Sequence, residues 1–241
     1  MTDGAAAGLP DAVDVIIPAF DESASIALVL EALPADRVRE VLVVDNGSTD
    51  DTARVAARCG ATVVREPRRG YGSACLAGIE ALKRRPRPPD AVVFLDGDYS
   101  DDPEELPEIV GPVLDDRADL VVGSRVLGRR EPGALLPQAR FGNWLASGLI
   151  RLLYGVRVTD LGPFRAVRWT TLLRLGMADR DFGWTAEMQV KAARQGVRYL
   201  EVPVSYRRRV GVSKITGTFS GTLRAGWKIV YTVFRFRGGA R

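Results

Sequence analysis

The sequence contains no histidine and only two cysteines, Cys59 and Cys75, among its 241 residues. The missing imidazoles exclude the usual zinc sites and every catalytic triad or general base that depends on histidine. Two cysteines cannot build a disulfide-stabilised fold, and we expect both to be reduced thiols. Any acid–base chemistry must therefore come from carboxylates, lysine, tyrosine or bound water.

Long apolar runs are also absent from the sequence. No stretch approaches the ~18 consecutive apolar residues that a membrane span requires. The opening residues, MTDGAAAGLPDAVD, lack the basic and apolar segments of a signal peptide. Hydrophobic residues make up 46% and charged residues 27%, which is typical of a globular protein. We therefore expect a cytoplasmic protein with a sizeable core.

Charge is divided unequally along the chain. Residues 1–119 hold 12 Lys/Arg against 24 Asp/Glu, whereas residues 120–241 hold 22 against 6. This asymmetry suggests an acidic, metal-binding end facing a basic, anion-binding end, although two differently solvated faces would give the same count. The arginines are dispersed among apolar segments without a nucleic-acid-binding motif, so we expect no nucleic-acid partner.

Short β-branched runs alternate with helical patterns in the first half, which is typical of parallel strands joined by crossover helices. The expected strands are 13–18, 41–45, 62–65, 91–96 and 120–124. In the second half we expect helices near 141–154 and 186–195 and strands near 163–167 and 197–204, after a mobile loop over 126–137. The fold class is α/β, with a mostly parallel sheet flanked by helices.

We expect one domain over residues 13–217, with no linker inside it. Its two halves are a nucleotide-binding half, 13–124, and an acceptor half, 125–217. Residues 1–12 are expected to form a flexible N-terminus, and residues 218–241 an amphipathic C-terminal helix.

The carboxyl ends of the expected strands carry acidic residues. The apolar run VVFL leads directly into Asp96, Gly97 and Asp98. Two carboxylates separated by one glycine can approach one divalent cation, and hard oxygen ligands favour Mg²⁺ or Mn²⁺. An isolated Asp-Gly-Asp is also compatible with a polar turn that caps the next helix.

Two nucleotide-binding motifs can be rejected. A dinucleotide fingerprint needs glycines at the first strand-to-helix turn, which here reads PAFDES and has none. Gly70 and Gly72 form Gly-x-Gly after the third strand, with Cys75 at the third glycine position. No phosphate-binding P-loop is present either. Any nucleotide must be held in another way.

Several ordered motifs together resemble the family 2 glycosyltransferases, which have a GT-A fold. They are IIPAFDE, VLVVDNGSTDDT, PRRGYGSACLAGI and VVFLDGDYSDDPEEL. The later VGSR, TDLGPFRAV, GWTAEMQV and EVPVSYRRRVGVSK are most similar to the dolichyl- or polyprenyl-phosphate sugar synthase branch. The resemblance covers residues 13–215 in the same order, which is far more specific than any single motif.

The resemblance implies a role for each matching position. Asp96 and Asp98 would anchor Mg²⁺ or Mn²⁺, and the branch often has glutamine where Ser100 stands, which leaves a third ligand open. The residues implied to bind the donor are Pro18, Ala19, Asp21, Glu22, Asp45, Arg68, Arg69, Asp96, Gly97 and Asp98.

The resemblance also implies catalytic and acceptor residues. Besides Asp98, Glu187 matches the position of a general base, with a helix-surface glutamate as the alternative, and Asp160 would orient the acceptor. The residues implied to contact phosphate or acceptor are Arg125, Arg209, Ser213 and Lys214. If the acceptor is a phosphate monoester, it is already ionised, and Glu187 would chiefly position other groups.

The implied activity is inverting, metal-dependent transfer of a sugar from a UDP- or GDP-sugar to an acceptor such as polyprenyl phosphate. Two alternatives stay open: a sugar-phosphate nucleotidyltransferase, and a nucleotide-sugar-binding protein without activity. The first lacks its usual glycine-rich first turn carrying arginine and lysine.

The C-terminal segment has the pattern of an interfacial helix. On a helix, Arg224, Lys228 and Arg235 share one face, next to a face formed by Leu223, Trp227, Val230 and Phe234. Such a helix could lie on the inner face of the membrane, on the protein itself or on a second subunit of a homo-oligomer. The sequence leaves these three arrangements open.

Overall fold

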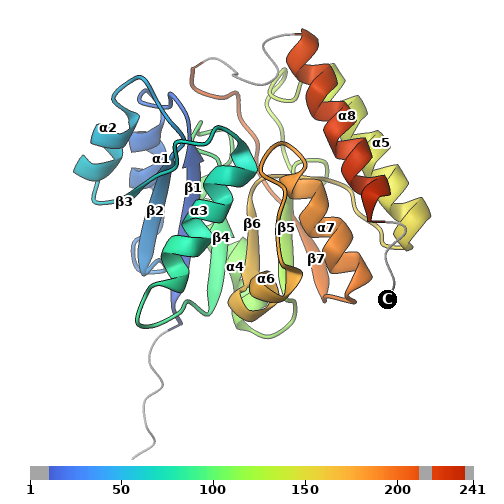
Figure 1. Ribbon diagram of the computed structural model, residues 1–241, viewed down its shortest axis with the longest axis horizontal. Helices are drawn as coiled ribbons and strands as arrows, with labels where there is room; N and C mark the ends of the chain where they lie inside the picture. Colours follow the sequence, from blue (N-terminus) through green and yellow to red (C-terminus); the bar gives the residue numbers. More distant parts are fainter. Residues whose placement is uncertain (1–10, 212–218, 237–241) are drawn as a thin grey trace, which may run out of the picture.

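The computed structural model describes residues 11–211 and 219–236. In this part of the chain, seven strands form one sheet in the order β3-β2-β1-β4-β6-β5-β7 (Figure 1). The strands are β1 Val13–Ala19, β2 Glu40–Asp45, β3 Thr62–Arg65, β4 Ala91–Phe94, β5 Leu120–Ser124, β6 Arg165–Arg168 and β7 Tyr199–Pro203. Only β6 runs antiparallel to its neighbours, β4 and β5. The expected mostly parallel sheet with flanking helices is confirmed.

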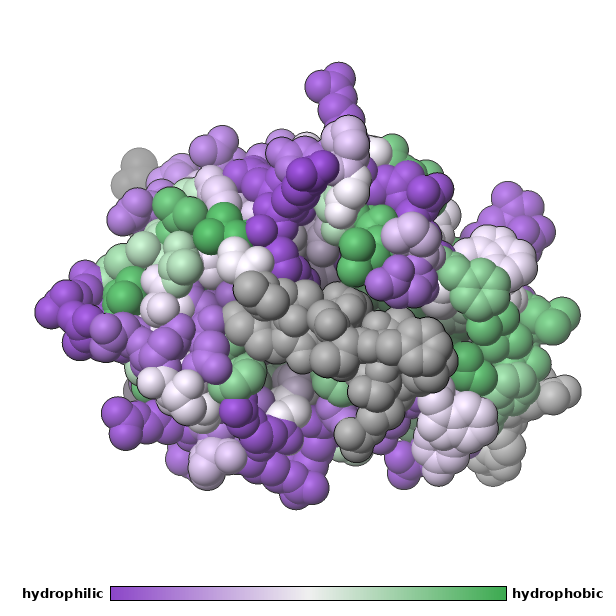
Figure 2. Space-filling view, turned by 90° about the horizontal axis from the view of Figure 1, so that it is seen from above, coloured by the Kyte–Doolittle hydropathy of each residue, from purple (hydrophilic) through white to green (hydrophobic). Residues whose placement is uncertain are grey.

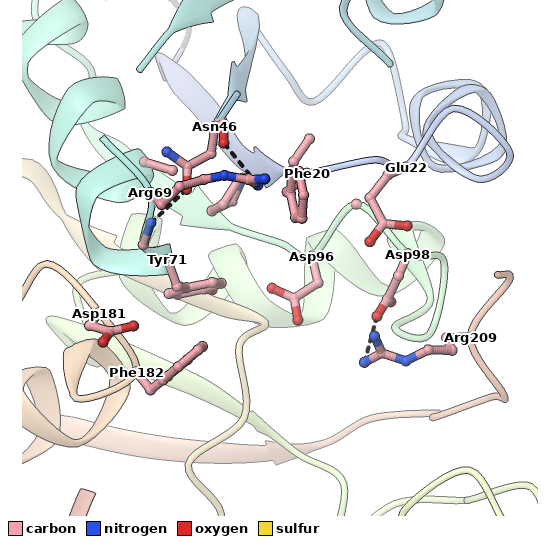
Figure 3. A pocket seen from close by; sticks show the side chains of 15 residues that line it. Phe20, Glu22, Asn46, Arg69, Tyr71, Asp96, Asp98, Asp181, Phe182 and Arg209 are labelled. Carbon is pink, nitrogen blue, oxygen red and sulfur yellow. Dashed lines mark hydrogen bonds and ion pairs between the residues drawn. The ribbon is translucent and has the colours of Figure 1, made fainter. Parts of the chain in front are cut away.

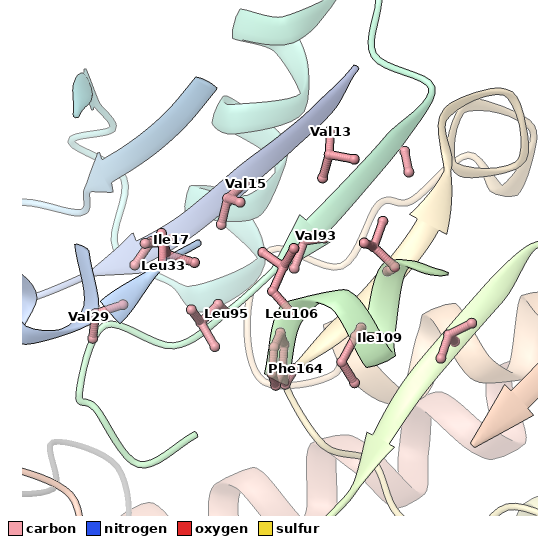
Figure 4. Packing of buried hydrophobic residues seen from close by; sticks show 14 of the residues in the cluster. Val13, Val15, Ile17, Val29, Leu33, Val93, Leu95, Leu106, Ile109 and Phe164 are labelled. Carbon is pink, nitrogen blue, oxygen red and sulfur yellow. The ribbon is translucent and has the colours of Figure 1, made fainter. Parts of the chain in front are cut away.

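Helices cover both faces of the sheet. They are α1 Ile26–Ala32, α2 Thr52–Arg58, α3 Tyr71–Lys83, the 3-10 turn η1 Pro103–Glu105, α4 Leu106–Leu114, α5 Pro137–Tyr154, α6 Trp169–Leu175, α7 Trp184–Arg194 and α8 Phe219–Arg235. Because side chains alternate along a strand, Val15 and Ile17 pack with α1 and α4, while Ile16 packs with α3 on the other face. Figure 4 shows the first of these two clusters.

Three local expectations differ from the structure. The fourth strand ends at Phe94, so Asp96 lies beyond the paired part of the sheet. Helix α6 was not expected. Asp102 accepts a hydrogen bond from the Glu104 amide and caps η1, but the Glu105 carboxylate accepts from the Ser205 amide at 2.8 Å. Asp102 before Pro103, with Glu105 three residues on, predicts a reciprocal capping box, but Glu105 is instead bound by the segment after β7.

Helix α8 packs on α5 and α7 through the buried side chains of Thr232 and Val233. The Tyr154 hydroxyl donates to the Val233 carbonyl at 2.5 Å. Trp227, the most exposed aromatic side chain of the described part of α8, is 73% exposed. The inner face of α8 thus docks on the protein itself. Within the described ranges, no helix combines the length and apolar character needed to cross a membrane.

Candidate active site

A cavity of about 420 Å³ opens at the carboxyl ends of β1, β2 and β4. Figure 3 shows its side chains, which converge from both halves of the chain. The lining residues are Pro18, Ala19, Phe20, Glu22, Asn46, Arg69, Gly70, Tyr71, Ala74, Asp96, Gly97, Asp98, Asp181, Phe182 and Arg209. Parallel strands place their carboxyl ends at one edge, so residues far apart in sequence meet there.

Asp98 is a fully engaged carboxylate at this edge. It is 4% exposed, and one oxygen accepts from the Ser100 amide at 2.9 Å and from the Ser100 hydroxyl. The other oxygen pairs with the Arg209 guanidinium at 2.8 Å. Ser100 therefore acts on Asp98 through two hydrogen bonds, and Arg209 neutralises it from the opposite side.

Asp96 contrasts with Asp98 because one of its oxygens, Oδ1, is buried without a hydrogen-bond partner among the described residues. Burial, followed by the negative charge of Asp98, raises the pKa of Asp96 to about 7. Burial and the neighbouring Asp96 also raise the pKa of the Tyr71 hydroxyl well above its usual range. The pair thus concentrates negative charge, which Arg209 and, to a smaller extent, Arg125 offset in part.

The two carboxylates are suitable ligands for a divalent cation. An orphaned carboxylate oxygen beside a second carboxylate is a site where a hard cation would relieve repulsion and supply the missing partner. No group of three or more metal-binding side chains occurs in the described residues. The remaining ligands would have to come from a bound diphosphate or water.

A basic loop after β3 is held in the cavity by Asn46. The side-chain amide of Asn46 donates to the carbonyl oxygens of Glu66 at 3.0 Å and Arg68 at 2.7 Å. The side-chain oxygen of Asn46 accepts from the Gly70 backbone amide at 2.8 Å. The Arg69 guanidinium lies 3.3 Å from the centre of the Phe20 ring. Arg69 therefore lines the cavity, whereas the Arg68 side chain does not.

The start of α3 packs directly on a loop from the second half of the chain. A Cβ atom on Gly70 or Gly72 would lie 2.1 Å or 2.0 Å from the carbonyl oxygens of Arg180 or Asp179. The Ser73 amide donates to the Arg180 oxygen at 2.9 Å. Only glycine permits this approach, which brings Asp181 and Phe182 to the cavity.

Several lining residues were missed by sequence reasoning. They are Phe20, Asn46, Gly70, Tyr71, Ala74, Asp181 and Phe182. The Gly-Tyr-Gly spacing was a usable signal for the first turn of α3. Nothing in the sequence indicates that residues 181–182 lie beside it.

Among the expected donor residues, Asp21 and Asp45 lie beside the cavity without lining it. Asp21 accepts from the Thr49 amide at 2.7 Å and joins the ends of β1 and β2. Asp45 accepts from the Ser48 amide at 3.0 Å and faces a separate groove beside α2. Their donor-binding roles stay predictions.

Glu187 is a buried residue of α7, 1% exposed, and does not line the cavity. Its carboxylate accepts from the Asp179 amide at 2.7 Å and from the Ala178 amide, and it pairs with Lys191 at 2.8 Å. The helix-surface alternative is therefore excluded. The two amide contacts hold the loop that carries Asp181 and Phe182, whereas Lys191 belongs to α7 itself.

Asp160 and Arg125 form a bidentate ion pair next to the cavity. Asp160 is fully buried and binds the Arg125 guanidinium at 2.7 and 2.8 Å and its amide at 2.8 Å. Glu201 of β7 accepts from the Asp160 amide at 3.2 Å. Asp160 thus fixes the position of Arg125 in the second half of the chain. Ser213 and Lys214, two further residues expected to contact phosphate, lie outside the described residues.

The segment 205–210, after β7, packs on the acidic loop 96–102. The Val210 amide donates to the Asp98 carbonyl at 3.0 Å, and Arg207 pairs with Asp102 at 2.7 Å. Beneath it, neither oxygen of the buried Asp101 has a hydrogen-bond partner in the described chain, and burial raises the pKa of Asp101 well above its usual range. This packing places Arg209 in the cavity.

Comparison with known proteins decides the family. Residues 14–170 match the sequence profile of glycosyl transferase family 2. The chain belongs to this family. An uncharacterized glycosyltransferase of Mycobacterium tuberculosis is 43% identical over 226 residues, covering 91% of this chain and 98% of that protein. Undecaprenyl-phosphate mannosyltransferase of Micrococcus luteus is 34% identical over 223 residues, covering 86% and 88%.

The fold agrees with that of a solved glycosyltransferase. Glucosyl-3-phosphoglycerate synthase of Mycobacterium tuberculosis, in complex with Mn²⁺, UDP and glucosyl-3-phosphoglycerate, superposes with a TM-score of 0.75 at 23% identity. The match covers 96% of this chain and 82% of that one. This family 2 glycosyltransferase therefore has the expected GT-A fold. Its family membership sets aside the nucleotidyltransferase and non-catalytic alternatives.

Proposed function

We propose that this glycosyltransferase uses a divalent cation to transfer a sugar, with inversion, from a UDP- or GDP-sugar to a polyprenyl phosphate. The observation that carries the proposal is the pair Asp96 and Asp98 in one cavity with Arg69 and Arg209. Carboxylates for a cation and guanidinium groups for phosphate oxygens are the two parts that a sugar diphosphate requires.

The chemistry follows from the charge that develops when the sugar–diphosphate bond breaks. A cation held by Asp96 and Asp98 would supply Lewis-acid stabilisation of the leaving diphosphate. Arg209 already carries a carboxylate partner at 2.8 Å, and it can turn another edge of its guanidinium toward phosphate oxygens. Arg69, stacked on Phe20, is placed to do the same from the opposite side of the cavity.

The acceptor side is assigned to Arg125 and the groove beyond it. Asp160 holds Arg125, and a groove of about 640 Å³ beside α5 is lined by Arg130, Arg140 and Arg151 together with Phe141 and Trp144. Guanidinium groups next to aromatic rings suit a phosphate attached to an apolar chain. The relative named for undecaprenyl phosphate supports this acceptor class.

No strong base is needed for such an acceptor, because a phosphate monoester is largely ionised near neutral pH. We therefore assign Glu187 a positioning role. Its carboxylate pairs with Lys191 of the same helix and accepts from two backbone amides, and the two amide contacts hold the loop that reaches the cavity.

The outer surfaces of α5 and α8 suit contact with the inner face of a membrane. Exposed side chains include Phe141, Trp144 and Leu152 of α5 and Trp227, Tyr231 and Phe234 of α8. Figure 2 shows green and pale residues gathered on the side of the molecule where these helices lie. Aromatic rings beside basic residues favour the interface of an anionic bilayer. Arg224 and Leu223 of the expected interfacial pattern lie outside the residues whose side chains are described.

The test is a transfer assay with purified protein, radiolabelled UDP- or GDP-sugars, and Mn²⁺ or EDTA. Separate arms contain a short-chain polyprenyl phosphate, the matching polyprenol without phosphate, and 3-phosphoglycerate. We expect a labelled lipid only with the phosphorylated polyprenyl acceptor and only with the cation. Transfer to 3-phosphoglycerate and not to polyprenyl phosphate would overturn the proposed acceptor. Transfer in EDTA would overturn the metal requirement.

Vesicle sedimentation tests the surface contact separately. The intact protein should sediment with vesicles containing anionic lipid and be released as ionic strength rises. Replacing Trp144 and Trp227 together by alanine should release it at lower salt, because two interfacial anchors are lost. Protein that stays in the supernatant at low salt would contradict membrane contact without affecting the transfer proposal.

A further inference from the structure

Residues 178–183, which we call the donor loop, connect α7 to the cavity. The Asp181 amide donates to Asp179 Oδ1 at 2.8 Å, so the Asp179 side chain shapes the turn that exposes Asp181 and Phe182. The Arg180 carbonyl accepts from the Ser73 amide at the start of α3. The conformation of this loop therefore affects two walls of the cavity at once.

The surface helix α8 contacts the same carboxylate. Lys228 Nζ lies 3.1 Å from Asp179 Oδ2, the oxygen that the Asp181 amide does not use. The side chain of Asp179 is 5% exposed and that of Lys228 is 35% exposed. Removing the lysine would leave a buried carboxylate without its cation, which favours rearrangement of the loop.

Gly183 makes this contact sterically possible. A Cβ atom at position 183 would lie 2.5 Å from Asp179 Oδ2 and 2.5 Å from the Thr232 hydroxyl of α8. Its φ of −74° is open to any residue, so the requirement is close approach and not backbone conformation. Helix α8 is thus packed against the donor loop at two positions, Lys228 and Thr232.

We propose that Lys228 is a positioning residue for the donor cavity. Its ion pair with Asp179 holds the donor loop, and thereby Asp181 and Phe182, in the arrangement that binds the nucleotide sugar. The inference rests on the proposed function only for the identity of this ligand. It links a helix on the outside of the molecule to the site of sugar transfer, a connection that the family motifs do not contain.

Removal of the lysine should leave α8 in place. Tyr154 of α5 donates to the Val233 carbonyl, and Arg194 of α7 donates to the Phe236 carbonyl at 2.8 Å. Val233 itself is fully buried. These contacts lie on the C-terminal side of Lys228, so the helix keeps its attachment when the ion pair is lost.

The experiment compares Lys228→Met with Lys228→Arg and with Arg235→Met as a matched control on α8. Donor affinity is measured by calorimetry with UDP- and GDP-sugars and Mn²⁺, alongside kcat at saturating donor and the melting temperature. We expect Lys228→Met to raise the donor Kd about tenfold, with kcat within twofold. Lys228→Arg should restore affinity, and Arg235→Met should leave it unchanged. An unchanged Kd in Lys228→Met would overturn the proposal.

A second variant tests whether the two partners act together. Asp179→Asn keeps the oxygen that accepts from the Asp181 amide and removes the charge that attracts Lys228. The double variant should bind donor no more weakly than either single variant, because both remove the same ion pair. Additive losses would show that Lys228 acts on something other than Asp179.

Amide exchange separates this inference from the proposed function. In Lys228→Met, the amides of Asp181 and Ser73 should exchange faster, with or without ligand. If the wild-type protein binds neither class of nucleotide sugar while these amides still respond, the ligand assignment fails and the positioning role stands. Unchanged exchange at both amides would overturn the positioning role directly.

Discussion

The two halves of the molecule build the cavity in different ways. In residues 13–124, the lining groups follow directly from strand ends or from the first turn of α3, and each βα unit delivers its own residue. In the second half, Asp181, Phe182 and Arg209 come from loops whose positions depend on partners far away in sequence. The first half therefore presents its groups from local βα units, whereas the groups of the second half are placed by tertiary contacts.

The charged groups of the two halves also differ in whether they have partners. Asp96 of the acidic half keeps an oxygen without a described partner, but Arg125 and Arg209 of the basic half are each paired with a carboxylate. A bound sugar diphosphate and its cation would supply the missing partner on one side and share the guanidinium groups on the other. The comparison predicts that acidic substitutions affect the chemical step, while basic substitutions mainly affect binding.

The largest expected effect comes from the acidic pair. Asp96→Asn and Asp98→Asn should each lower kcat by about 10²–10³-fold, because either change weakens stabilisation of the leaving diphosphate. The measurement is sugar transfer at saturating donor and Mn²⁺. Asp115→Asn, on the surface, is the control and should keep full activity. Normal turnover in Asp96→Asn would break the distinction between the two halves.

Removal of Arg209 is expected to act on donor binding. Arg209→Ala should raise the donor KM by about 10–50-fold and lower kcat much less, because a charge-assisted contact to phosphate is lost. The neighbouring Arg208 donates to the Pro132 carbonyl outside the cavity, so Arg208→Ala is the matched control. A fall in kcat with unchanged KM would assign Arg209 to the chemical step instead.

The size of the rate loss on substitution of Glu187 tells whether this residue is a general base or a positioning group. Loss of a general base typically costs about 10²–10⁴-fold in rate. Because Glu187 is bound by the Ala178 and Asp179 amides, we expect Glu187→Gln to lower kcat/KM by less than about tenfold. Steady-state kinetics over a pH range provide the measurement. A loss above 10²-fold with an unchanged melting temperature would make Glu187 the base.

The smallest effect concerns stability and pH. Burial and Asp98 raise the pKa of Asp96 from 3.8 to about 7, so between these values the folded protein binds more protons than the unfolded chain. Stability contributed by this group therefore falls as pH rises from about 4 to 7. In metal-free buffer, Asp96→Asn should melt about 2–4 °C above wild type at pH 8 and with little difference at pH 4.

Addition of Mn²⁺ at pH 8 provides the control for this measurement. It should raise the melting temperature of the wild type more than that of Asp96→Asn, because binding to the folded state alone stabilises it. Equal shifts in both proteins would place the cation elsewhere.

Secondary structure of the first half followed from the sequence because its signals are local. Alternating β-branched runs and apolar stripes placed all five strands within two residues, and the run VVFL indicated that Asp96 and Asp98 stand at a strand end. Later elements were also located from local patterns, except for α6. The antiparallel direction of β6 was not evident, because pairing direction depends on the partner strands and not on the strand's own residues.

The sequence by itself determined the acidic motif, the basic loops and the family resemblance, because these depend on residue type and spacing. Only the tertiary structure decided that Asp98 is paired while Asp96 Oδ1 has no hydrogen-bond partner among the described residues, that Arg69 and not Arg68 lines the cavity, and that Glu187 holds a loop. It also decided that α8 packs on the protein and meets the donor loop through Lys228. Burial and partner choice arise from contacts between distant segments, and no local pattern encodes them.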